Sequence, residues 1–584
     1  MQKIGIGYEN YKRLIDEGCY YVDKTMLIKD IIEKGGIVNL FTRPRRFGKT
    51  LALSMIRTFF ELEYDFDGNV IEKNRYFEGK KIMQCENPIL SKMGKYPVIK
   101  LSLKSAKQPD FNTSFLKLRE EIVNEFRRHK YLLDSDSLTI EDKEIFKNLL
   151  NGIVIWNAKS NNIADNKEVT RSMIREEYGK YSTSLRTLSN LLQIHHKKNV
   201  IILLDEYDVP LENAYYNGFY NEMTGFIRSL FESALKTNDA LEFAVVTGCL
   251  RISKESIFTG LNNFVVNSVR STDFGEYFGF TTKETFNMLD AYGLEKNHET
   301  VMDWYDGYLF GECEVYNPWS VTHYIYEHIN APDRLAEPYW SNTSSNAIIK
   351  DMINTADETA RKELDILING GTIEKSVHED ITYDDINTDP DNLWNFLFFT
   401  GYMKRVSERA EGNNVYMTMK IPNREVASIY ENQIQFWFEN IVRKTEHNSF
   451  QHAVLNKDTQ TMEDYLGDLM EKSISTFDSS ESFYHGLLLS LLYGVPRYVP
   501  KSNRETGDGR PDIILYPNRP KDPAYIFELK VRKKFNEMDD GIKKAFEQIK
   551  EKRYEDGVLE EGYIGAVSYA ICFCKKSCII RVMD

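Results

Sequence analysis

A short segment near the start of the chain constrains the fold more than any other feature. Residues 40–51 read LFTRPRRFGKTL, which matches the phosphate-loop pattern G-x-x-x-x-G-K-[ST] except that Arg43 stands at the first glycine. The apolar residues 37–41 predict a strand before the loop, and residues 50–60 predict a helix after it. A strand, a tight loop and a helix N-terminus form an anion site, because free N–H groups and the helix dipole face the ligand. The segment therefore predicts an α/β fold with a phosphate-binding loop.

Four residues of this loop are candidate ligands for ATP. Gly48, Lys49 and Thr50 fill the last three places of the pattern, where the lysine reaches the β- and γ-phosphates and the threonine hydroxyl holds Mg²⁺. The side chain of Arg43 could crowd the β-phosphate or contact it, and we expect a contact, worth about 1–3 kcal/mol as a charge-assisted hydrogen bond. The alternative for the whole motif is a chance G-K-T at a helix start.

A second motif downstream argues against chance. Residues 199–206 read NVIILLDE, which predicts a buried strand that ends in two carboxylates. In P-loop ATPases the aspartate at such a strand end, here Asp205, helps to position Mg²⁺. Glu206 would then polarise the attacking water. The alternative is a solvated strand end before a turn, but the two motifs occur in the order that an ATPase needs.

With two further segments, these motifs resemble a known family. The segments YYVDKT (20–25), TRPRRFGKTL, LLDEYDVPL and TGCLRISKESIFTGLNN (247–263) are similar to the bacterial AAA-ATPase-like family. The resemblance covers residues 1–275, and its members commonly end in a PD-(D/E)XK nuclease-like domain. The family also carries the Arg-Pro-Arg-Arg loop, so Arg43 is a family trait.

The resemblance also implies roles for two residues after the second motif. Thr247 ends the strand that usually carries a γ-phosphate sensor, although a simple strand terminus is an equal alternative. Arg251, just beyond it, is either a nucleotide-state sensor or a finger directed at a partner.

Two apolar segments near the C-terminal end supply a second chemistry. Residues 509–516 (GRPDIILY) and 524–530 (AYIFELK) predict a hairpin of strands that carries Asp512, Glu528 and Lys530. Glu528 and Lys530 are two positions apart, so they project from one face of a strand. Carboxylates are ligands of Mg²⁺ or Mn²⁺, and a lysine beside a metal-bound water favours hydroxide. A solvated sheet face explains most lone E-x-K sequences, but the D-x15-E-x-K hairpin predicts a nuclease site.

Flanking helices extend this prediction. Glu481 and His485 lie one turn apart on a predicted helix, and PD-(D/E)XK folds often place a metal-facing glutamate there. Gln548 and Tyr554 resemble the DNA- or metal-facing residues of exonuclease-like members, at looser spacing. This second resemblance covers about residues 440–584.

The charge distribution limits how nucleic acid could bind. A net charge of −14 argues against a generally basic surface, because phosphate contacts need clustered cations. A local track is still present after the nuclease motif: Lys530, Arg532, Lys533, Lys534, Lys543, Lys544, Lys550, Lys552 and Arg553. We expect Lys533 and Lys552 to contact nucleic acid, with DNA favoured. The alternative is a solvated helix of alternating Lys and Glu.

Composition also bears on location and on the cysteines. No stretch reaches the ~18–20 apolar residues of a membrane span, and the N-terminus MQKIG has no apolar core or cleavage signal. We therefore expect a cytoplasmic protein without a membrane segment. Cys572, Cys574 and Cys578 lie close together, but a zinc site lacks a fourth ligand at suitable spacing. A C-terminal pair of strands is favoured.

The length of 584 residues predicts about three domains. We expect a P-loop NTPase-like parallel sheet over 1–275 with a helical insertion at about 104–195, a helical and winged-helix-like middle over 276–435, and an α/β restriction-endonuclease-like domain over 436–584. Strands of the first domain are expected at 37–42, 96–103, 199–205, 242–247 and 264–270.

The middle region carries aromatic clusters and a helix followed by a β-ribbon. Clusters such as WYDGY (304–308) are expected to pack helices together, and base stacking is the alternative. Residues 396–403 and 415–423 predict the helix and ribbon of a winged helix, which would act as a lid or as a DNA reader.

Taken together, the motifs predict a protein that binds and hydrolyses ATP and whose nucleotide state controls a metal-dependent nuclease. Mobile-element control or defence is suggested by analogy alone. One alternative is a nucleotide-gated module that grips nucleic acid or protein through an inactive nuclease fold. Another is an ATPase whose last domain is an oligomerisation scaffold. The choice between DNA and RNA, the cutting specificity, the trigger and homo-oligomerisation are left open.

Overall fold

The computed structural model describes most of the chain, which divides into two compact units. The described residues are 2–65, 67–151, 176–236, 238–251, 263–340, 349, 358–379, 383, 390–433, 448–471, 481–493, 495–502, 506 and 509–583. The first unit comprises Met1–Thr343 and Glu374–Val426, and the second comprises Ser344–Ile373 and Ala427–Asp584. Much of the predicted middle region therefore packs with the N-terminal sheet, while the boundaries at 275 and 435 stay a prediction.

The first unit is built on a parallel sheet of five strands in the order β2-β3-β4-β1-β5. The strands are β1 (Val38–Thr42), β2 (Val98–Ser102), β3 (Val200–Asp205), β4 (Leu241–Gly248) and β5 (Phe264–Asn267). Every residue of β1 and β3 is buried, as expected for central strands covered on both faces. The predicted parallel α/β sheet is confirmed, and only β4 extends beyond its expected segment, by one residue at each end.

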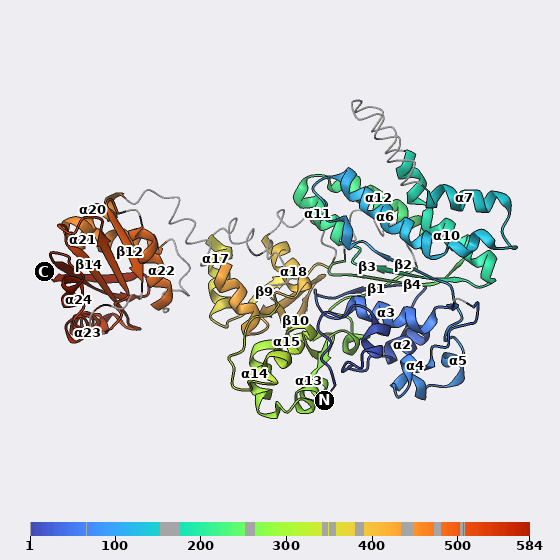
Figure 1. Ribbon diagram of the computed structural model, residues 1–584, viewed down its shortest axis with the longest axis horizontal. Helices are drawn as coiled ribbons and strands as arrows, with labels where there is room; N and C mark the ends of the chain where they lie inside the picture. Colours follow the sequence, from blue (N-terminus) through green and yellow to red (C-terminus); the bar gives the residue numbers. More distant parts are fainter. Residues whose placement is uncertain are drawn as a thin grey trace. The chain divides into compact units, whose positions relative to one another are not determined.

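Helices cover both faces of this sheet (Figure 1). One face carries α1 (Tyr11–Asp16), α2 (Met26–Lys34), α3 (Lys49–Phe60), α4 (Asn74–Phe77) and α5 (Asn87–Leu90), and the other carries α6 (Phe111–Arg128), α7 (Ile140–Leu150), α10 (Ser184–His196), α11 (Val209–Asn217) and α12 (Tyr220–Phe231). Helix α6 shows why these segments are helical. Its N-cap Asp110 accepts a hydrogen bond from the Thr113 N–H, and its apolar stripe, including Phe115 and Ile122, is buried.

A second layer of the first unit follows the sheet in sequence. It contains a small sheet, β6 (Phe280–Thr281), β8 (Cys313–Tyr316) and β7 (Tyr308–Phe310), with helices α13 (Thr282–Ala291), α14 (His298–Tyr305) and α15 (Pro318–His328). Tyr305, Tyr316 and Tyr324 are buried in one cluster, so the aromatic residues pack helices as expected. Helix α18 (Pro390–Thr400) then leads into an antiparallel ribbon of β10 (Lys404–Glu411) and β11 (Asn414–Lys420), which pairs with β9 (Ile373–Ser376).

A close contact joins the residue Gly401, which precedes this ribbon, to the side chain of Pro44 in the phosphate loop. Gly401, between α18 and β10, has φ +93°, which disfavours any side chain. A Cβ placed there would lie 2.8 Å from Cβ of Pro44, closer than real Cβ atoms approach their neighbours. Pro44 of the phosphate loop therefore packs directly against the start of the ribbon.

A buried carboxyl group anchors the residues after the ribbon. Glu425 is 0% exposed and accepts hydrogen bonds from the Trp340 N–H at 2.7 Å and from the Ser320 hydroxyl at 2.8 Å. Burial is the main cause that raises its pKa to about 7, from an ordinary value of 4.5.

This shift predicts a pH dependence of stability. Between about pH 4.5 and pH 7 the folded state holds the Glu425 proton more tightly than the unfolded state. The contribution of Glu425 to the free energy of unfolding is therefore fully present below about pH 4.5. It is lost as the pH rises towards 7, and the total loss is about 3 kcal/mol. Glu425→Gln cannot ionise, so its melting temperature should fall less than that of the wild type between pH 5 and pH 8. Parallel melting curves for the two proteins would contradict this assignment.

The second unit contains a mixed sheet of five strands in the order β12-β13-β14-β15-β16. The strands are β12 (Tyr498–Ser502), β13 (Ile513–Pro517), β14 (Ala524–Val531), β15 (Ala566–Cys574) and β16 (Ser577–Met583), and only β14 and β15 are parallel. Its helices are α17 (Glu358–Ile368), α20 (Asn448–Asn456), α21 (Thr459–Glu471), α22 (Glu481–Leu492), α23 (Met538–Glu551) and α24 (Tyr554–Glu560). The expected α/β fold is confirmed, and the three clustered cysteines lie on the predicted pair of strands, β15 and β16.

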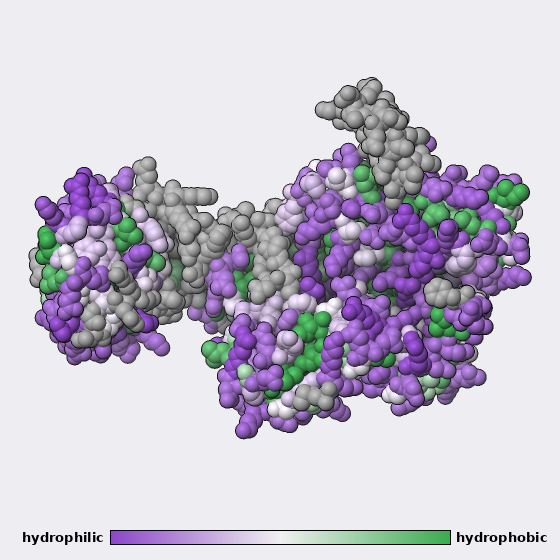
Figure 2. All heavy atoms as spheres, viewed as in Figure 1, coloured by the Kyte–Doolittle hydropathy of each residue, from purple (hydrophilic) through white to green (hydrophobic). Residues whose placement is uncertain are grey.

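Two surface properties accompany this architecture. Hydrophilic residues dominate the face that Figure 2 shows, in keeping with a charged content of 28%. Within the described residues, no helix combines the length and the apolar character that crossing a bilayer requires.

Candidate nucleotide and metal sites

The phosphate loop runs from the end of β1 to the start of α3. Arg46 and Gly48 have φ angles of 70° and 82°, so the loop turns twice through the left-handed region before the helix begins. Gly48 is the N-cap of α3, a position where its missing side chain permits this conformation. The N–H of Arg43 donates to the carbonyl of Gly248 at 3.0 Å, which ties the loop to the end of β4.

Lys49 lies inside the loop. Its side chain is buried, and Nζ donates to the carbonyl oxygens of Arg43 at 2.8 Å and Pro44 at 2.9 Å. The Sγ atom of Cys249 lies 3.7 Å from the same nitrogen. The ammonium group is thus held by the loop backbone at the place where an anion would enter.

Three candidate residues converge beside this lysine. The Asp205 carboxylate accepts a hydrogen bond from the Thr50 hydroxyl at 2.7 Å and from the Thr247 hydroxyl at 2.6 Å. The residues come from α3, β3 and β4, which meet at the carboxyl edge of the sheet. A carboxylate beside a hydroxyl is a fitting donor set for Mg²⁺, which prefers oxygen ligands.

Glu206 follows Asp205 directly and lines the cavity described below. Its φ of 52° is unusual for a residue other than glycine. Burial and, after it, the charge of Asp205 raise the pKa of Glu206, so its carboxylate is a stronger base than usual.

Arg43 is oriented differently from either sequence expectation. Its side chain is 0% exposed, and Nη1 donates to the carbonyls of Thr42 at 2.9 Å and Asn267 at 2.7 Å. The guanidinium lies 5.3 Å from the ring centroid of Phe278 and 5.0 Å from that of Phe310. This geometry favours a structural role, in which Arg43 joins the loop to β5 and the small sheet, over contact with phosphate or crowding of it.

A stability measurement tests this role. Arg43→Ala removes a large buried side chain and its hydrogen bonds, so we expect the free energy of unfolding to fall by about 2–4 kcal/mol. Urea denaturation measures this loss. The ATP affinity of the folded variant should change less than that of Lys49→Ala. If Arg43→Ala instead lost much of its ATP affinity and none of its stability, Arg43 would have to contact phosphate and the structural role would be wrong.

Arg251 follows β4 and faces a carboxylate of the second layer. Its Nη1 lies 3.8 Å from Glu379, which also pairs with Arg270 at 2.7 Å. Its sensor or finger role stays a prediction, and residues 252–262 lie outside the described part of the chain.

The arginines of β10 are also engaged with carboxylates. Arg405 pairs with Glu312 at 2.8 Å, and Arg409 pairs with Glu374 at 2.7 Å. Paired arginines have less positive charge to offer to DNA phosphates, so this arrangement favours a lid over a DNA reader.

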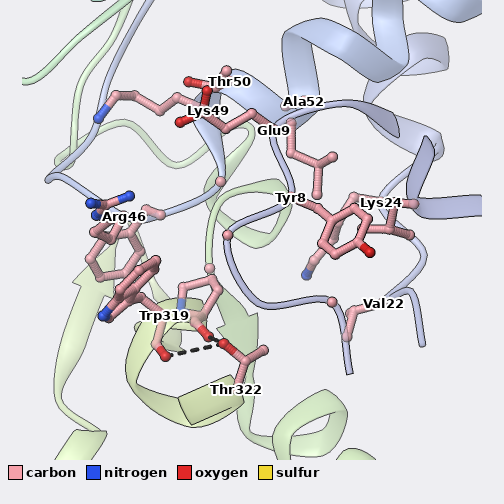
Figure 3. A pocket seen from close by; sticks show the side chains of 18 of the residues that line it. Tyr8, Glu9, Val22, Lys24, Arg46, Lys49, Thr50, Ala52, Trp319 and Thr322 are labelled. Carbon is pink, nitrogen blue, oxygen red and sulfur yellow. Dashed lines mark hydrogen bonds between the residues drawn. The ribbon is translucent and has the colours of Figure 1, made fainter. Parts of the chain in front are cut away.

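A cavity of about 340 Å³ opens beside the phosphate loop (Figure 3). Most of its lining comes from three segments: residues of the N-terminal stretch 5–24, the loop with the start of α3, and residues between 277 and 322. Lys104, Lys107, Glu206 and Val209 complete the lining. No motif in the sequence predicted this cavity. Trp319 belongs to an aromatic cluster that is typical of a core, and no local signal distinguishes a ring that lines a cavity.

In the second unit, the hairpin brings the three nuclease candidates together. Lys530 Nζ donates to Glu528 Oε1 at 2.7 Å, and the N–H of Leu529 donates to Asp512 Oδ2 at 2.7 Å. Glu528 is 1% exposed, and its Oε2 has no hydrogen-bond partner among the described residues. Burial and, after it, the charge of Asp512 raise the pKa of Glu528 to about 7.

These features fit a divalent cation. A buried carboxylate oxygen without a donor, next to a second carboxylate, is an arrangement that a cation would stabilise. Within the part of the chain that the structure describes, no group of three or more His, Cys, Asp and Glu side chains is arranged to hold a metal. Glu481 begins α22, but its side chain lies outside the described residues, so its role as a ligand stays a prediction.

Of the remaining candidates, Tyr554 and its partner Gln548 lie near this pair. Gln548 Nε2 donates to the Tyr554 hydroxyl at 3.3 Å, and the charges of Glu528 and Asp512 add to burial in raising the pKa of Tyr554. Tyr554 therefore lies near the acidic pair. Lys533 and Lys552 are exposed, and their nucleic-acid contacts stay a prediction.

His485 is a neighbour of this site whose role the sequence did not specify. Its Nε2 lies 2.9 Å from the carbonyl oxygen of Asp512 and 3.0 Å from Oγ of Ser502. The helix α22 thereby holds the backbone that carries the first carboxylate.

Comparison with known proteins identifies a domain around each site. Residues 5–258 match a family described as "Predicted AAA-ATPase", and residues 479–582 match the PD-(D/E)XK nuclease superfamily. The chain thus combines an AAA-ATPase-like domain with a PD-(D/E)XK nuclease-superfamily domain, which confirms both resemblances. It is also 25% identical over 438 residues to an "Uncharacterized protein in vnfD 5'region" of Azotobacter chroococcum mcd 1, covering 74% of this chain and 69% of that protein.

Proposed function

We propose that this protein binds and hydrolyses ATP and that its nucleotide state controls a metal-dependent nuclease. The observation that carries the ATP site is the convergence of Thr50 and Thr247 on Asp205, beside the buried Lys49. The nuclease site rests on the open oxygen of Glu528 next to Asp512 and Lys530.

Each residue of the ATP site has a defined task. Lys49 neutralises charge on the β- and γ-phosphates, and Thr50 and Asp205 would hold Mg²⁺, which would supply further charge neutralisation. Glu206 orients the attacking water and accepts its proton, a task that its raised pKa favours. Thr247 senses the γ-phosphate through the carboxylate of Asp205, to which its hydroxyl already donates a hydrogen bond, and so links the phosphate to β4.

In the nuclease site, Asp512 and Glu528 would hold Mg²⁺ or Mn²⁺, and Glu481 would complete the acidic wall. The metal ion, when bound, lowers the pKa of a water and polarises the scissile phosphate. Lys530 orients that water and neutralises developing charge. Lys533, Lys552 and Gln548 contact the nucleic acid, for which DNA is favoured.

Control would operate as a population shift. Nucleotide binding biases the arrangement of the second layer, including the ribbon as a winged-helix lid, and thereby the access to the nuclease site. Mobile-element control or defence in the cytoplasm is the setting that such domain pairs suggest by analogy.

The direct test is a cleavage assay with the purified full chain. Single- and double-stranded DNA and RNA are incubated with and without Mg²⁺, Mn²⁺ and ATP. Metal-dependent cleavage whose rate changes with ATP supports the proposal. Binding without cleavage under every condition would favour the alternative, a nucleotide-gated binding module with an inactive nuclease fold.

A further inference from the structure

The cavity beside the phosphate loop is larger than the phosphate site needs. It has a volume of about 340 Å³ and extends from Lys49 and Thr50 to aromatic side chains of two other segments. The phosphate chain of a nucleotide would occupy only the end at the loop. The remaining space is open to another part of the same ligand.

Aromatic residues form much of the wall. Tyr8, Tyr20 and Tyr21 come from the N-terminal stretch, and Phe280 and Trp319 come from the second layer. Aromatic side chains offer flat apolar faces to a heterocyclic base, and stacking on them is strong for every base.

The Trp319 side chain is held in place before any ligand binds. Its Nε1 donates to the carbonyl of Tyr339 at 3.3 Å, and its backbone N–H donates to Asn317 Oδ1 at 2.9 Å. The guanidinium of Arg46, in the phosphate loop, lies 4.2 Å from the indole centroid (Figure 3). The guanidinium therefore covers one face of the indole, and the stacked pair forms a platform that begins at the phosphate loop and can stack with a base through its outer face.

The opposite wall is also fixed. Lys24 is 8% exposed and ties the N-terminal stretch to the second layer, because Nζ donates to the carbonyl of Glu276 at 2.6 Å and to the carboxylate of Glu284. Asp23 binds the N–H of Lys81 at 2.8 Å and so holds the same stretch on the sheet side. A wall that is already ordered costs a ligand little conformational entropy.

We infer that this cavity binds the base and ribose of a purine nucleoside triphosphate, with the base against the platform of Arg46 and Trp319. The inference rests on the proposed function, because the loop must hold the phosphates. A purine gains more from stacking than a pyrimidine, since its ring system is larger. Phe280 and Trp319 lie beyond residue 258, where the AAA-ATPase match ends. The second layer therefore forms part of the nucleotide site itself.

The test separates the base from the phosphates. Affinities of the full chain for ATP, GTP, CTP and inorganic tripolyphosphate are measured by calorimetry in the presence of Mg²⁺. Trp319→Ala should weaken ATP binding by about tenfold or more and change tripolyphosphate binding less than about twofold, because only the stacking partner is lost. Wild type should prefer ATP and GTP to CTP.

Trp304→Ala is the matched control. Trp304 also packs against an arginine, with the guanidinium of Arg424 at 4.9 Å, but it does not line the cavity. Its substitution should leave all four affinities unchanged.

A second measurement covers the case in which Trp319→Ala fails to fold. Saturating ATP should quench the indole fluorescence of the wild type more than that of Trp319→Phe, whereas tripolyphosphate should quench both equally. Tripolyphosphate binding as tight as ATP binding, with equal quenching in both proteins, would overturn the nucleoside pocket and leave the phosphate site intact. Failure to bind ATP and tripolyphosphate alike would overturn the proposed function as well.

Discussion

Lys49→Ala is expected to abolish ATP binding by the full chain. The ammonium group is already placed inside the loop by the carbonyls of Arg43 and Pro44, so it meets the phosphates without rearranging. Two charge-assisted hydrogen bonds to phosphate account for a loss of at least about 100-fold in affinity. Calorimetry with ATP and Mg²⁺ measures it. Lys117→Ala, an exposed lysine of α6, is the control and should bind normally.

Glu206→Gln separates binding from hydrolysis at the same site. The amide keeps the size of the side chain but cannot accept a proton from water, so binding should persist while phosphate release slows by about 100-fold or more.

The outcome that would contradict the ATP site concerns Lys49→Ala. Equal ATP affinities for the wild type and this variant would remove the basis for the whole site, because no other lysine is placed inside the loop.

The second large effect concerns the nuclease site. Asp512→Asn keeps an oxygen that can accept the Leu529 N–H but loses its negative charge, and Lys530→Met keeps the length of the side chain but loses the ammonium group. Each should reduce metal-dependent cleavage by at least about 100-fold, because cation binding and water activation depend on these charges. ATP affinity should stay unchanged, since the ATP site lies in the other unit.

The control and the binding measurement sharpen this prediction. Lys501→Ala, an exposed lysine of β12, should cleave normally. Nucleic-acid binding, measured by fluorescence anisotropy, should survive Lys530→Met better than the combined loss of Lys533 and Lys552. Cleavage by Asp512→Asn at the wild-type rate would place the catalytic metal elsewhere.

Much of each site could be predicted because its residues sit on, or next to, strands that apolar segments of the sequence predict. The edge where parallel strands end is set by the topology, so the motifs that end in Asp205 and Thr247 had to meet the loop once the sheet was recognised. The hairpin that carries Asp512 and Glu528 follows in the same way from two apolar segments joined by a short turn.

The features that sequence could not reveal depend on packing between distant segments. A pattern match locates Arg43 in the loop but carries no information on its side-chain direction, which Phe278 and Phe310 determine. The cavity likewise depends on Lys24 meeting Glu284, 260 positions later, and on the position of Trp319 opposite the N-terminal stretch. The spacing of apolar residues within one segment does not predict contacts between segments so far apart in the sequence.

The contact between Gly401 and Pro44 makes two remote parts of the chain sterically dependent on each other. A methyl group at Gly401 would collide with the phosphate loop, so the residue before the ribbon can be enlarged only if the loop changes shape. The tolerance of position 401 to substitution is thus set by a proline far upstream. In homologous chains, the two positions should change together, and an insertion between α18 and β10 should be as harmful to ATP binding as an insertion within the loop.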